Sequence, residues 1–146
     1  MRAAAPLVHG ATGSVTRALV ADGLLAAGAR PMLTESEQEA PTLVTVADAL
    51  LVNLGSLSGD GMAGLLPTAR AAVKHGVPWV LDPTAVGLAP VRTPLAHELL
   101  ALGPTVLRGN ASEVITLAGG TGSGRGAERS EEHTSELQSR SMISYA

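Results

Sequence analysis

The sequence predicts an α/β domain built on a mainly parallel sheet, and three observations lead to this fold class. Short apolar segments alternate along the chain with longer segments of helical periodicity, which is typical of strands joined by helical crossovers. One Trp, one Tyr and no Phe occur in 146 residues, so the core must consist of Leu, Val and Ala, which suits helices packed on a parallel sheet. Polar or glycine-bearing loops follow the apolar segments. The chain is about as long as one domain.

Charge and composition argue against several classes of function. The 10 basic and 13 acidic residues give a net charge of −3, and Lys and Arg form no block, so we expect no nucleic-acid or anionic-membrane partner. The absence of cysteine excludes disulfides and cysteine-based metal sites or nucleophiles. No apolar run approaches the ~18 residues of a membrane span, and residues 1–5 lack the apolar core of a secretion signal. We therefore expect a cytoplasmic protein.

The first predicted elements are a strand and a long helix. An extended apolar segment at residues 6–9 leads through a glycine-bearing turn into a helix that Gly28 ends. Thr12 or Ser14 could cap the start of this helix, because both side chains can accept a hydrogen bond from a free amide. The apolar face that should pack on the sheet comprises Val15, Leu19, Val20 and Leu24.

Two strands and two helices are predicted in the middle of the chain. A short strand at 31–34 is followed by an acidic loop and a short helix that ends at Val46. Residues 49–53 form an apolar run typical of a buried strand. Residues 62–75 have helical periodicity in spite of Pro67, which should kink the helix or mark a late start.

The last elements repeat the same alternation. Residues 77–81 form the clearest buried strand, and a helix from Thr93 to Leu102 follows it. A β-branched run at 105–107 predicts a further strand that leads into a helix ending near Ala118. Together these elements complete the strand and helix alternation on which the fold class rests.

Three polar loops come directly after predicted strands. They are Asn53-Leu54-Gly55, Asp82-Pro83 and Arg108-Gly109-Asn110. In open α/β sheets, ligands bind beyond the carboxyl ends of the strands. We therefore expect these three loops to converge on one site.

The segment from Arg108 to Glu113 is the best candidate for holding phosphate. Asn110 can accept from the amide of Glu113 while the Glu113 side chain reaches back, which is a variant of the capping box. The free amides at such a helix start favour an anion, and the Arg108 guanidinium adds a fixed positive group. The alternative is an ordinary strand–helix junction with a surface arginine.

Two carboxylates in these loops are candidate ligands for Mg²⁺. Asp82 follows a buried strand and Glu113 stands at a helix start, near the phosphate site predicted at Arg108. Mg²⁺ typically uses one or two carboxylates together with water and substrate phosphates. The alternatives are that Asp82 is a turn residue before proline and that Glu113 only completes the cap.

The pattern of alternating elements stops near residue 120. We predict that residues 1–120 form the amino-terminal part of a domain and that residues 121–128 form a flexible loop. Residues 129–146 resemble the in-frame translation of a common sequencing adapter, which predicts a non-native tail and a fold truncated at its carboxyl end. The alternatives for this tail are a disordered segment or a terminal helix.

Five motifs, in order along the chain, resemble the hydroxyethylthiazole kinase family. They are PLVH at 6–9, LLAAGARP at 24–31, VNLGSL at 52–57, PWVLDP at 78–83 and RGNASE at 108–113. The resemblance implies a ribokinase-like fold and transfer of the ATP γ-phosphate to the hydroxyl of 4-methyl-5-(2-hydroxyethyl)thiazole, a step of thiamine biosynthesis and salvage. It also implies a homotrimer with active sites between subunits.

The resemblance also implies roles for individual residues. Arg108 and Asn110 are expected to bind ATP, and Asp82 and Glu113 are expected to lie around Mg²⁺. The thiazole alcohol is expected to contact Met32, Leu33, Asn53 and Gly55.

The chain departs from the family at several positions. Gly10 and Gly13 stand where the family usually has asparagines, and Leu33 aligns with the methionine of the substrate pocket. His9 could act as a base near the substrate or could be a structural histidine. The later glycine-rich segment that forms the family's anion hole and activates the hydroxyl has no counterpart here. We therefore assign no catalytic residue and expect this chain to be inactive alone.

Two other functions remain open at this point. One is a different ribokinase-like vitamin kinase, such as one that acts on the hydroxymethylpyrimidine side of thiamine synthesis. The other is a non-catalytic α/β fragment that binds a nucleotide.

Overall fold

The chain folds around a five-stranded sheet in which every pair of neighbouring strands is parallel. The computed structural model describes residues 5–120. The strand order is β2-β1-β3-β4-β5, which confirms the predicted α/β class and the parallel sheet. The strands are β1 (Leu7–Ala11), β2 (Arg30–Leu33), β3 (Ala49–Asn53), β4 (Trp79–Asp82) and β5 (Val106–Leu107).

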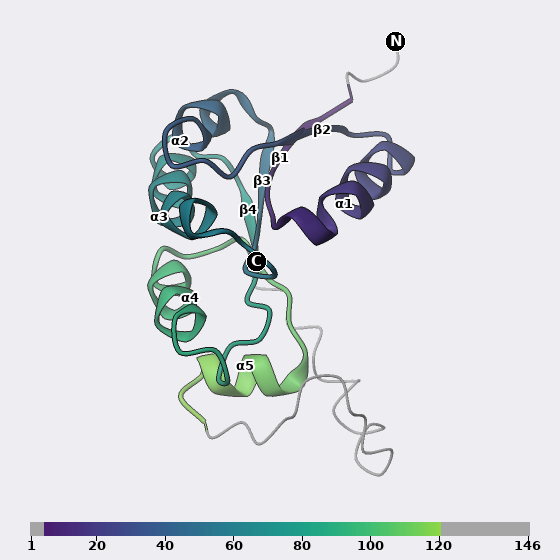
Figure 1. Ribbon diagram of the computed structural model, residues 1–146. Helices are drawn as coiled ribbons and strands as arrows, with labels where there is room; N and C mark the ends of the chain where they lie inside the picture. The colour runs from purple at the N-terminus through teal and green to yellow at the C-terminus, as the bar shows by residue number, and fades with distance from the viewer. Residues whose placement is uncertain (1–4, 121–146) are drawn as a thin grey trace.

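The helices cover the sheet unequally. In Figure 1, α1 lies on one side of the strands, whereas α2, α3 and α4 lie on the other side and α5 lies beyond the carboxyl ends of the strands. None of the helices in the described part of the chain is long and apolar enough to cross a membrane. The helices are α1 (Ser14–Ala26), α2 (Ala40–Leu43) continued by the 3₁₀ turn η1 (Val44–Val46), α3 (Gly59–Lys74), α4 (Arg92–Ala101) and α5 (Ala111–Leu117).

The hydrophobic core lies between the sheet and the helices α3 and α4. It is built almost entirely from Leu, Val and Ala side chains, as the composition predicts, with Trp79 as its one aromatic member. Leu65, Ala69 and Ala72 lie on the buried face of α3 and belong to this core. Fully or almost fully buried members of this core include Leu50, Val52, Leu65, Ala69, Ala72, Leu81 and Leu99.

The apolar face predicted for the first helix is only partly correct. Val20 and Leu24 are half-buried, but Val15 and Leu19 remain 78% and 74% exposed, and no residue of α1 is fully buried. The reason is tertiary: α1 stands alone on its side of the sheet in Figure 1, so nothing in the described part of the chain covers its outer apolar side chains.

Helices α1 and α3 begin at residues other than those predicted. Gly13 occupies the N-cap of α1 without a side-chain bond, while the Thr12 hydroxyl pairs with that of Thr16 at 2.6 Å. Helix α3 begins three residues earlier than expected, because the Ser58 hydroxyl accepts from the Gly61 amide at 2.9 Å. Pro67 therefore lies inside α3 rather than at its start.

The last two helices are close to prediction. Helix α4 begins one residue before Thr93, whose hydroxyl accepts from the Gly87 amide at 2.9 Å and donates to the Ala89 carbonyl at 2.7 Å.

The two predicted segments after residue 120, 121–128 and 129–146, lie outside the described residues. Their interpretation as a loop and a non-native tail stays a prediction.

Candidate functional site

The loops after β3, β4 and β5 meet at the carboxyl edge of the sheet, as the sequence predicts. A Cβ atom built on Gly55 would lie 3.5 Å from the Thr84 side chain, which joins the first two loops. A Cβ atom built on Gly109 would lie 3.7 Å from the Pro83 ring, which joins the second and third. In the sheet register, Asn53 is the partner of Asp82. The polar residues of all three loops therefore share one edge.

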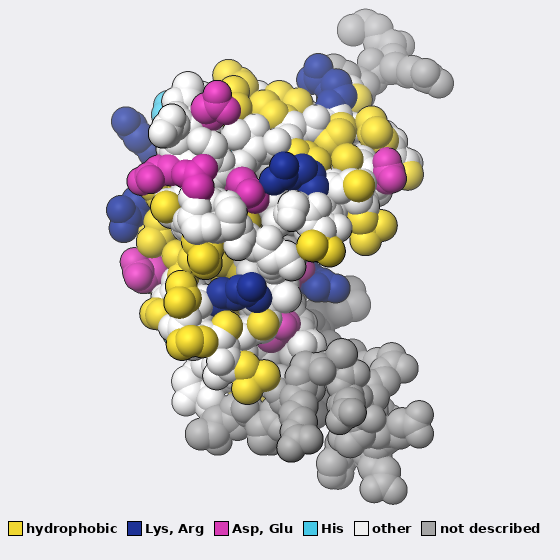
Figure 2. Space-filling model, in the orientation of Figure 1, with side chains coloured by type: hydrophobic (Ala, Val, Ile, Leu, Met, Phe, Trp, Pro, Cys, Tyr) yellow, Lys and Arg dark blue, Asp and Glu magenta, His cyan; other side chains and the backbone are white. Residues whose placement is uncertain are grey.

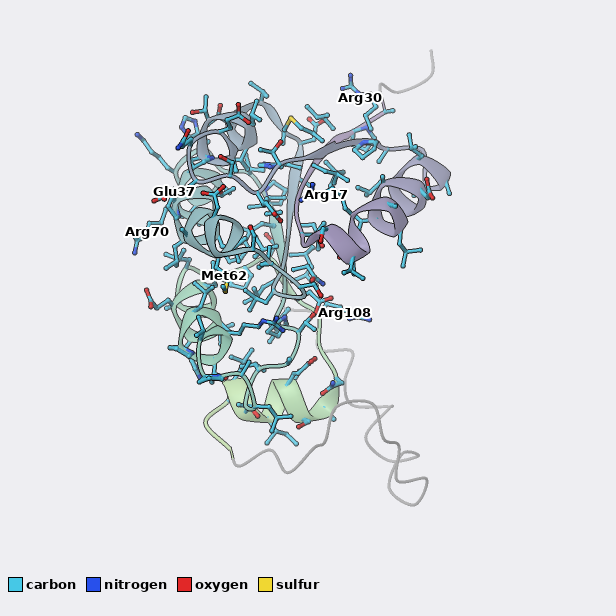
Figure 3. The ribbon with its side chains drawn as sticks, viewed as in Figure 1. Arg17, Arg30, Glu37, Met62, Arg70 and Arg108 are labelled. Carbon is cyan, nitrogen blue, oxygen red and sulfur yellow. The ribbon has the colours of Figure 1, made fainter. Side chains whose placement is uncertain are left out.

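Asp82 and Arg108 form an ion pair across two neighbouring strands. The Arg108 Nη1 atom donates to Asp82 Oδ2 at 2.9 Å, and the Thr84 hydroxyl donates to Oδ1 at 3.1 Å. The Asp82 side chain is 10% exposed, whereas that of Arg108 is 73% exposed. Because a guanidinium carries five N–H donors, Arg108 is held in place at one nitrogen and presents the others to solvent at the sheet edge (Figure 3).

Glu113 completes the predicted capping box and also reaches the neighbouring loop. Asn110 Oδ1 accepts from the Glu113 amide, and Glu113 Oε2 accepts from the Asn110 amide, both at 2.9 Å. The second carboxylate oxygen, Oε1, accepts from the Ala85 amide at 3.1 Å. One carboxylate therefore fixes the start of α5 and the loop after β4 at the same time.

Two loops of this edge carry backbone that side chains rarely adopt. Ser56 has a φ of 53° and Ala85 a φ of 66°, and they are the non-glycine residues with positive φ in the described part of the chain. Such conformations cost free energy and persist where the surroundings impose them. The Ala85 amide is held by its hydrogen bond to Glu113 Oε1.

The donor set at this edge fits Mg²⁺ bound jointly with phosphate rather than a closed protein cage. Within residues 5–120, no group of three or more His, Cys, Asp or Glu side chains is arranged to hold a metal. Asp82 and Glu113 flank the same short loop, and each of their four oxygens accepts one hydrogen bond. A carboxylate oxygen has two acceptor sites, so both residues retain capacity for a cation whose other ligands are water and phosphate oxygens.

The candidate substrate residues on β2 lie at the other end of the same edge. Met32 pairs with His9, and Leu33 pairs with Gly10. Successive strand residues point to opposite faces of a sheet, so Met32 and Leu33 cannot both line one pocket from the same face. Leu33 occupies the space above Gly10, where a Cβ atom would lie 2.6 Å from Leu33 Cδ2.

The other candidate substrate residues lie between the two ends of the edge. Asn53 Oδ1 accepts from the Gly55 amide at 2.8 Å, so Asn53 shapes the turn after β3. Gly55 is buried, and a Cβ atom there would lie 2.9 Å from that same Asn53 oxygen. The structure thus brings the phosphate and substrate candidates to one edge, where Asn53 and Gly55 lie between the β2 candidates and the candidate phosphate subsite at Asp82 and Arg108. The ligand contacts themselves stay predictions.

His9 is a buried histidine with one hydrogen bond. Its side chain is fully buried, and Nε2 lies 2.8 Å from the Thr34 carbonyl oxygen, to which it must donate. Nδ1 has no hydrogen-bond partner among the described residues. Burial lowers the pKa of His9 from its usual value of 6.5, and the hydrogen bond to Thr34 offsets part of this effect. This environment supports the interpretation of His9 as a structural histidine rather than a base.

Acidification is expected to destabilise the fold through His9. Below about pH 6.5 the unfolded chain takes up a proton on His9 that the folded chain, with its lower pKa, does not bind. The free energy of unfolding should therefore fall as the pH drops from about 6.5 towards the folded-state pKa. Urea unfolding of the wild type and of His9→Gln between about pH 5 and pH 8 measures this. The exposed His75→Gln is the matched control, and equal pH slopes in wild type and His9→Gln would contradict the prediction.

The sequence did not indicate two hydrogen-bond donors at this edge. They are the Thr84 hydroxyl, which donates to Asp82, and the Ala85 amide, which donates to Glu113. Both residues follow Asp82-Pro83 directly, so the only sequence signal was their place in a loop after a buried strand.

The chain is similar in sequence to one family of known proteins. The model of the hydroxyethylthiazole kinase family matches residues 1–144. A hydroxyethylthiazole kinase of Clavibacter sepedonicus is 43% identical over 143 residues, which are 98% of this chain and 52% of the relative. One of Klebsiella pneumoniae is 45% identical over 141 residues, which are 94% and 53%.

A solved structure shows the same arrangement of elements. The hydroxyethylthiazole kinase of Pyrococcus horikoshii superposes with a TM-score of 0.74 at 36% identity, covering 78% of this chain and 45% of that protein. This chain spans about half the length of the curated relatives it matches. On these matches, the chain belongs to the hydroxyethylthiazole kinase family.

Proposed function

We propose that this chain carries the amino-terminal part of an enzyme that transfers the γ-phosphate of ATP to the hydroxyl of 4-methyl-5-(2-hydroxyethyl)thiazole, in the cytoplasm. Family membership supports the reaction class. The observation that carries the proposal is the arrangement at the sheet edge, where an exposed Arg108 guanidinium is anchored on a nearly buried Asp82 beside Glu113. Phosphoryl transfer needs chiefly positioning and neutralisation of charge, and these groups would supply part of both.

Each residue of the phosphate subsite has a proposed task. Arg108 binds ATP phosphate oxygens through its solvent-facing N–H groups, while its bond to Asp82 fixes the direction of the side chain. Asn110 is proposed to contact ATP from the turn that it caps. Asp82 and Glu113 would hold Mg²⁺, which when bound would neutralise phosphate charge.

The thiazole alcohol is proposed to bind at the β2 end of the edge. The Met32–Leu33 segment would supply the apolar contact, and Asn53 and Gly55 would border the substrate on the side of the phosphate subsite. Because Met32 and Leu33 face opposite sides of the sheet, we propose that one contacts the substrate directly and the other supports the strand. Leucine in place of methionine keeps the apolar contact but loses the adaptable thioether.

A homotrimer is proposed for the full-length enzyme, and helix α1 supports a subunit contact. Val15, Leu19 and Leu25 are 78%, 74% and 58% exposed. Figure 2 shows apolar side chains gathered over the α1 side of the molecule. Exposed apolar clusters of this kind commonly mark protein interfaces.

The direct test compares this chain with a version extended to the length of its relatives. We expect the extended enzyme to phosphorylate the thiazole alcohol with ATP and Mg²⁺, and this chain alone to show no turnover, because it spans only about half the length of its relatives. Equal rates from the two proteins would contradict the expectation that this chain is inactive alone. Turnover of a hydroxymethylpyrimidine in place of the thiazole alcohol would favour another vitamin kinase.

Arg108→Ala in the extended enzyme should raise the KM for ATP about tenfold or more, since charge-assisted hydrogen bonds to phosphate would be lost. The KM for the thiazole alcohol should change little, because Arg108 lies at the opposite end of the edge from Met32. Arg70→Ala, an exposed arginine on α3 (Figure 3), is the matched control. An unchanged ATP dependence in Arg108→Ala would exclude Arg108 from the phosphate subsite.

Because this chain spans about half the length of its relatives, a second function is proposed for the chain by itself. It could bind a nucleotide without catalysis, because Arg108, Asp82 and Glu113 are all present at the edge. Calorimetric titration of this chain with MgATP tests this description. Binding that Arg108→Ala abolishes would support it, and no heat of binding at millimolar nucleotide would refute it.

A further inference from the structure

An ion pair outside the phosphate subsite joins three elements at the β2 end of the edge. Glu35, in the loop between β2 and α2 (residues 34–39, the β2–α2 loop), places Oε1 3.2 Å from Arg17 Nη2 of α1. The Ser58 hydroxyl at the start of α3 donates to the same oxygen at 3.4 Å. The labelled Arg17 lies between α1 and α3 in Figure 3. One carboxylate thus links helices on opposite sides of the sheet.

The backbone of the β2–α2 loop is held at several further points. The Thr34 carbonyl accepts from the His9 ring at 2.8 Å. A Cβ atom on Gly64 would overlap the Glu35 carbonyl oxygen, and one on Gly61 would lie 3.0 Å from the Glu35 carboxyl carbon. These glycines are three residues apart and so share one face of α3. Helix α3 is therefore shaped to let this loop rest directly on its backbone.

The Glu35 carboxylate depends on Arg17 because it is mostly buried. The Glu35 side chain is 16% exposed and that of Arg17 is 43% exposed. Glu35 Oε2 is buried and has no hydrogen-bond partner among the described residues. A buried carboxylate that loses its counter-charge is strongly unfavourable, and the loop that carries it must then move to reach water.

We infer that Arg17 and Glu35 form a clamp on the β2–α2 loop, and that this clamp governs binding of the thiazole alcohol by fixing Met32 and Leu33. The substrate assignment rests on the proposed function. Glu35 follows Leu33 by two residues, so displacement of the loop moves the end of β2 directly. Arg17 and Glu35 are positioning residues, because neither belongs to the phosphate subsite at Asp82 and Arg108.

The clamp itself is tested on this chain by amide hydrogen exchange, with no need for activity. The amides of Gln38, Glu39 and Ala40 bond to Ser36 within the loop. In Glu35→Gln and in Arg17→Gln they should exchange about three- to tenfold faster than in the wild type. Glu37→Gln and Arg70→Gln, exposed residues labelled in Figure 3, are the matched controls and should leave exchange unchanged.

The effect on substrate is tested in the extended enzyme. Glu35→Gln and Arg17→Gln should each raise the KM for the thiazole alcohol about three- to tenfold, while kcat and the KM for ATP stay within about twofold. The double variant should be no worse than either single variant, because both remove the same interaction. Arg17→Lys, which keeps the charge, should restore part of the affinity.

The outcomes separate the clamp from the proposed function. Unchanged loop exchange in Glu35→Gln and Arg17→Gln overturns the clamp, whatever the kinetics. Faster exchange together with a fall in kcat and equal rises in the KM for both substrates overturns the positioning role. The ion pair would then be purely structural. An extended wild type with no thiazole kinase activity overturns the proposed function and the substrate assignment with it, while the exchange result still decides the clamp.

Discussion

Asp82→Asn in the extended enzyme is expected to lower kcat for thiazole phosphorylation about a hundredfold or more. The carboxylate stands at the edge where Mg²⁺ and phosphate are proposed to bind, and loss of one such charge typically removes several kcal/mol of transition-state stabilisation. The same change removes the ion pair that directs Arg108. The amide keeps the shape of the side chain and can still accept from the Thr84 hydroxyl, so the fold should persist.

Steady-state kinetics at varied Mg²⁺ concentration measure this prediction. The half-saturating Mg²⁺ concentration should rise in Asp82→Asn, whereas the KM for the thiazole alcohol should stay close to that of the wild type. Glu98→Gln, an exposed acid-to-amide change on α4, is the matched control. A kcat within about fivefold of the wild type, with ordinary Mg²⁺ dependence, would show that Asp82 is only a turn residue.

Gly13→Ala is expected to destabilise the fold by about 2–3 kcal/mol. A Cβ atom at Gly13 would overlap the carbonyl oxygens of Gly55 and Ser56. Both obstacles are backbone atoms, so no rotamer change relieves the overlap and one of the two loops must shift. Because Gly13 caps the start of α1, the shift would also disturb the helix.

Urea unfolding of this chain measures the loss, with a glycine of the same helix as the control. Gly23 lies in the last turn of α1 with nothing within 4 Å of an added Cβ atom. Gly23→Ala should therefore stabilise the chain by roughly 0.5–1 kcal/mol, the helical preference of alanine over glycine. Equal effects of the two substitutions would contradict the close approach of the loops after β1 and β3.

The approach at Gly13 also gives a physical meaning to a departure from the family. The sequence by itself indicated only that Gly10 and Gly13 stand where the family usually has asparagines. The structure adds that any side chain at Gly13 would meet backbone, and that Leu33 fills the space above Gly10. These glycines therefore permit close packing at the same edge that is proposed to hold the substrate.

The sequence by itself determined the features that depend on composition and on residues close together in the chain. Hydrophobic periodicity was enough for the order of strands and helices, and the missing aromatics were enough for an aliphatic core, because both depend on neighbouring residues and composition. The capping box of Asn110 and Glu113 was correct to the atom, since its partners are three residues apart. The convergence of the three loops followed from the rule that parallel strands end at one edge.

Contacts between distant segments were decided only by the tertiary structure. Asp82 and Arg108 are 26 residues apart, and nothing in either loop indicated that the carboxylate would hold the arginine. The exposure of Val15 and Leu19 depends on what packs over α1, which periodicity does not contain. The pairing of Arg17 with Glu35 likewise needs α1, β2 and α3 to be placed together. Local pattern determines which residues can form an element, whereas burial and charge pairing depend on which elements the folded chain brings into contact.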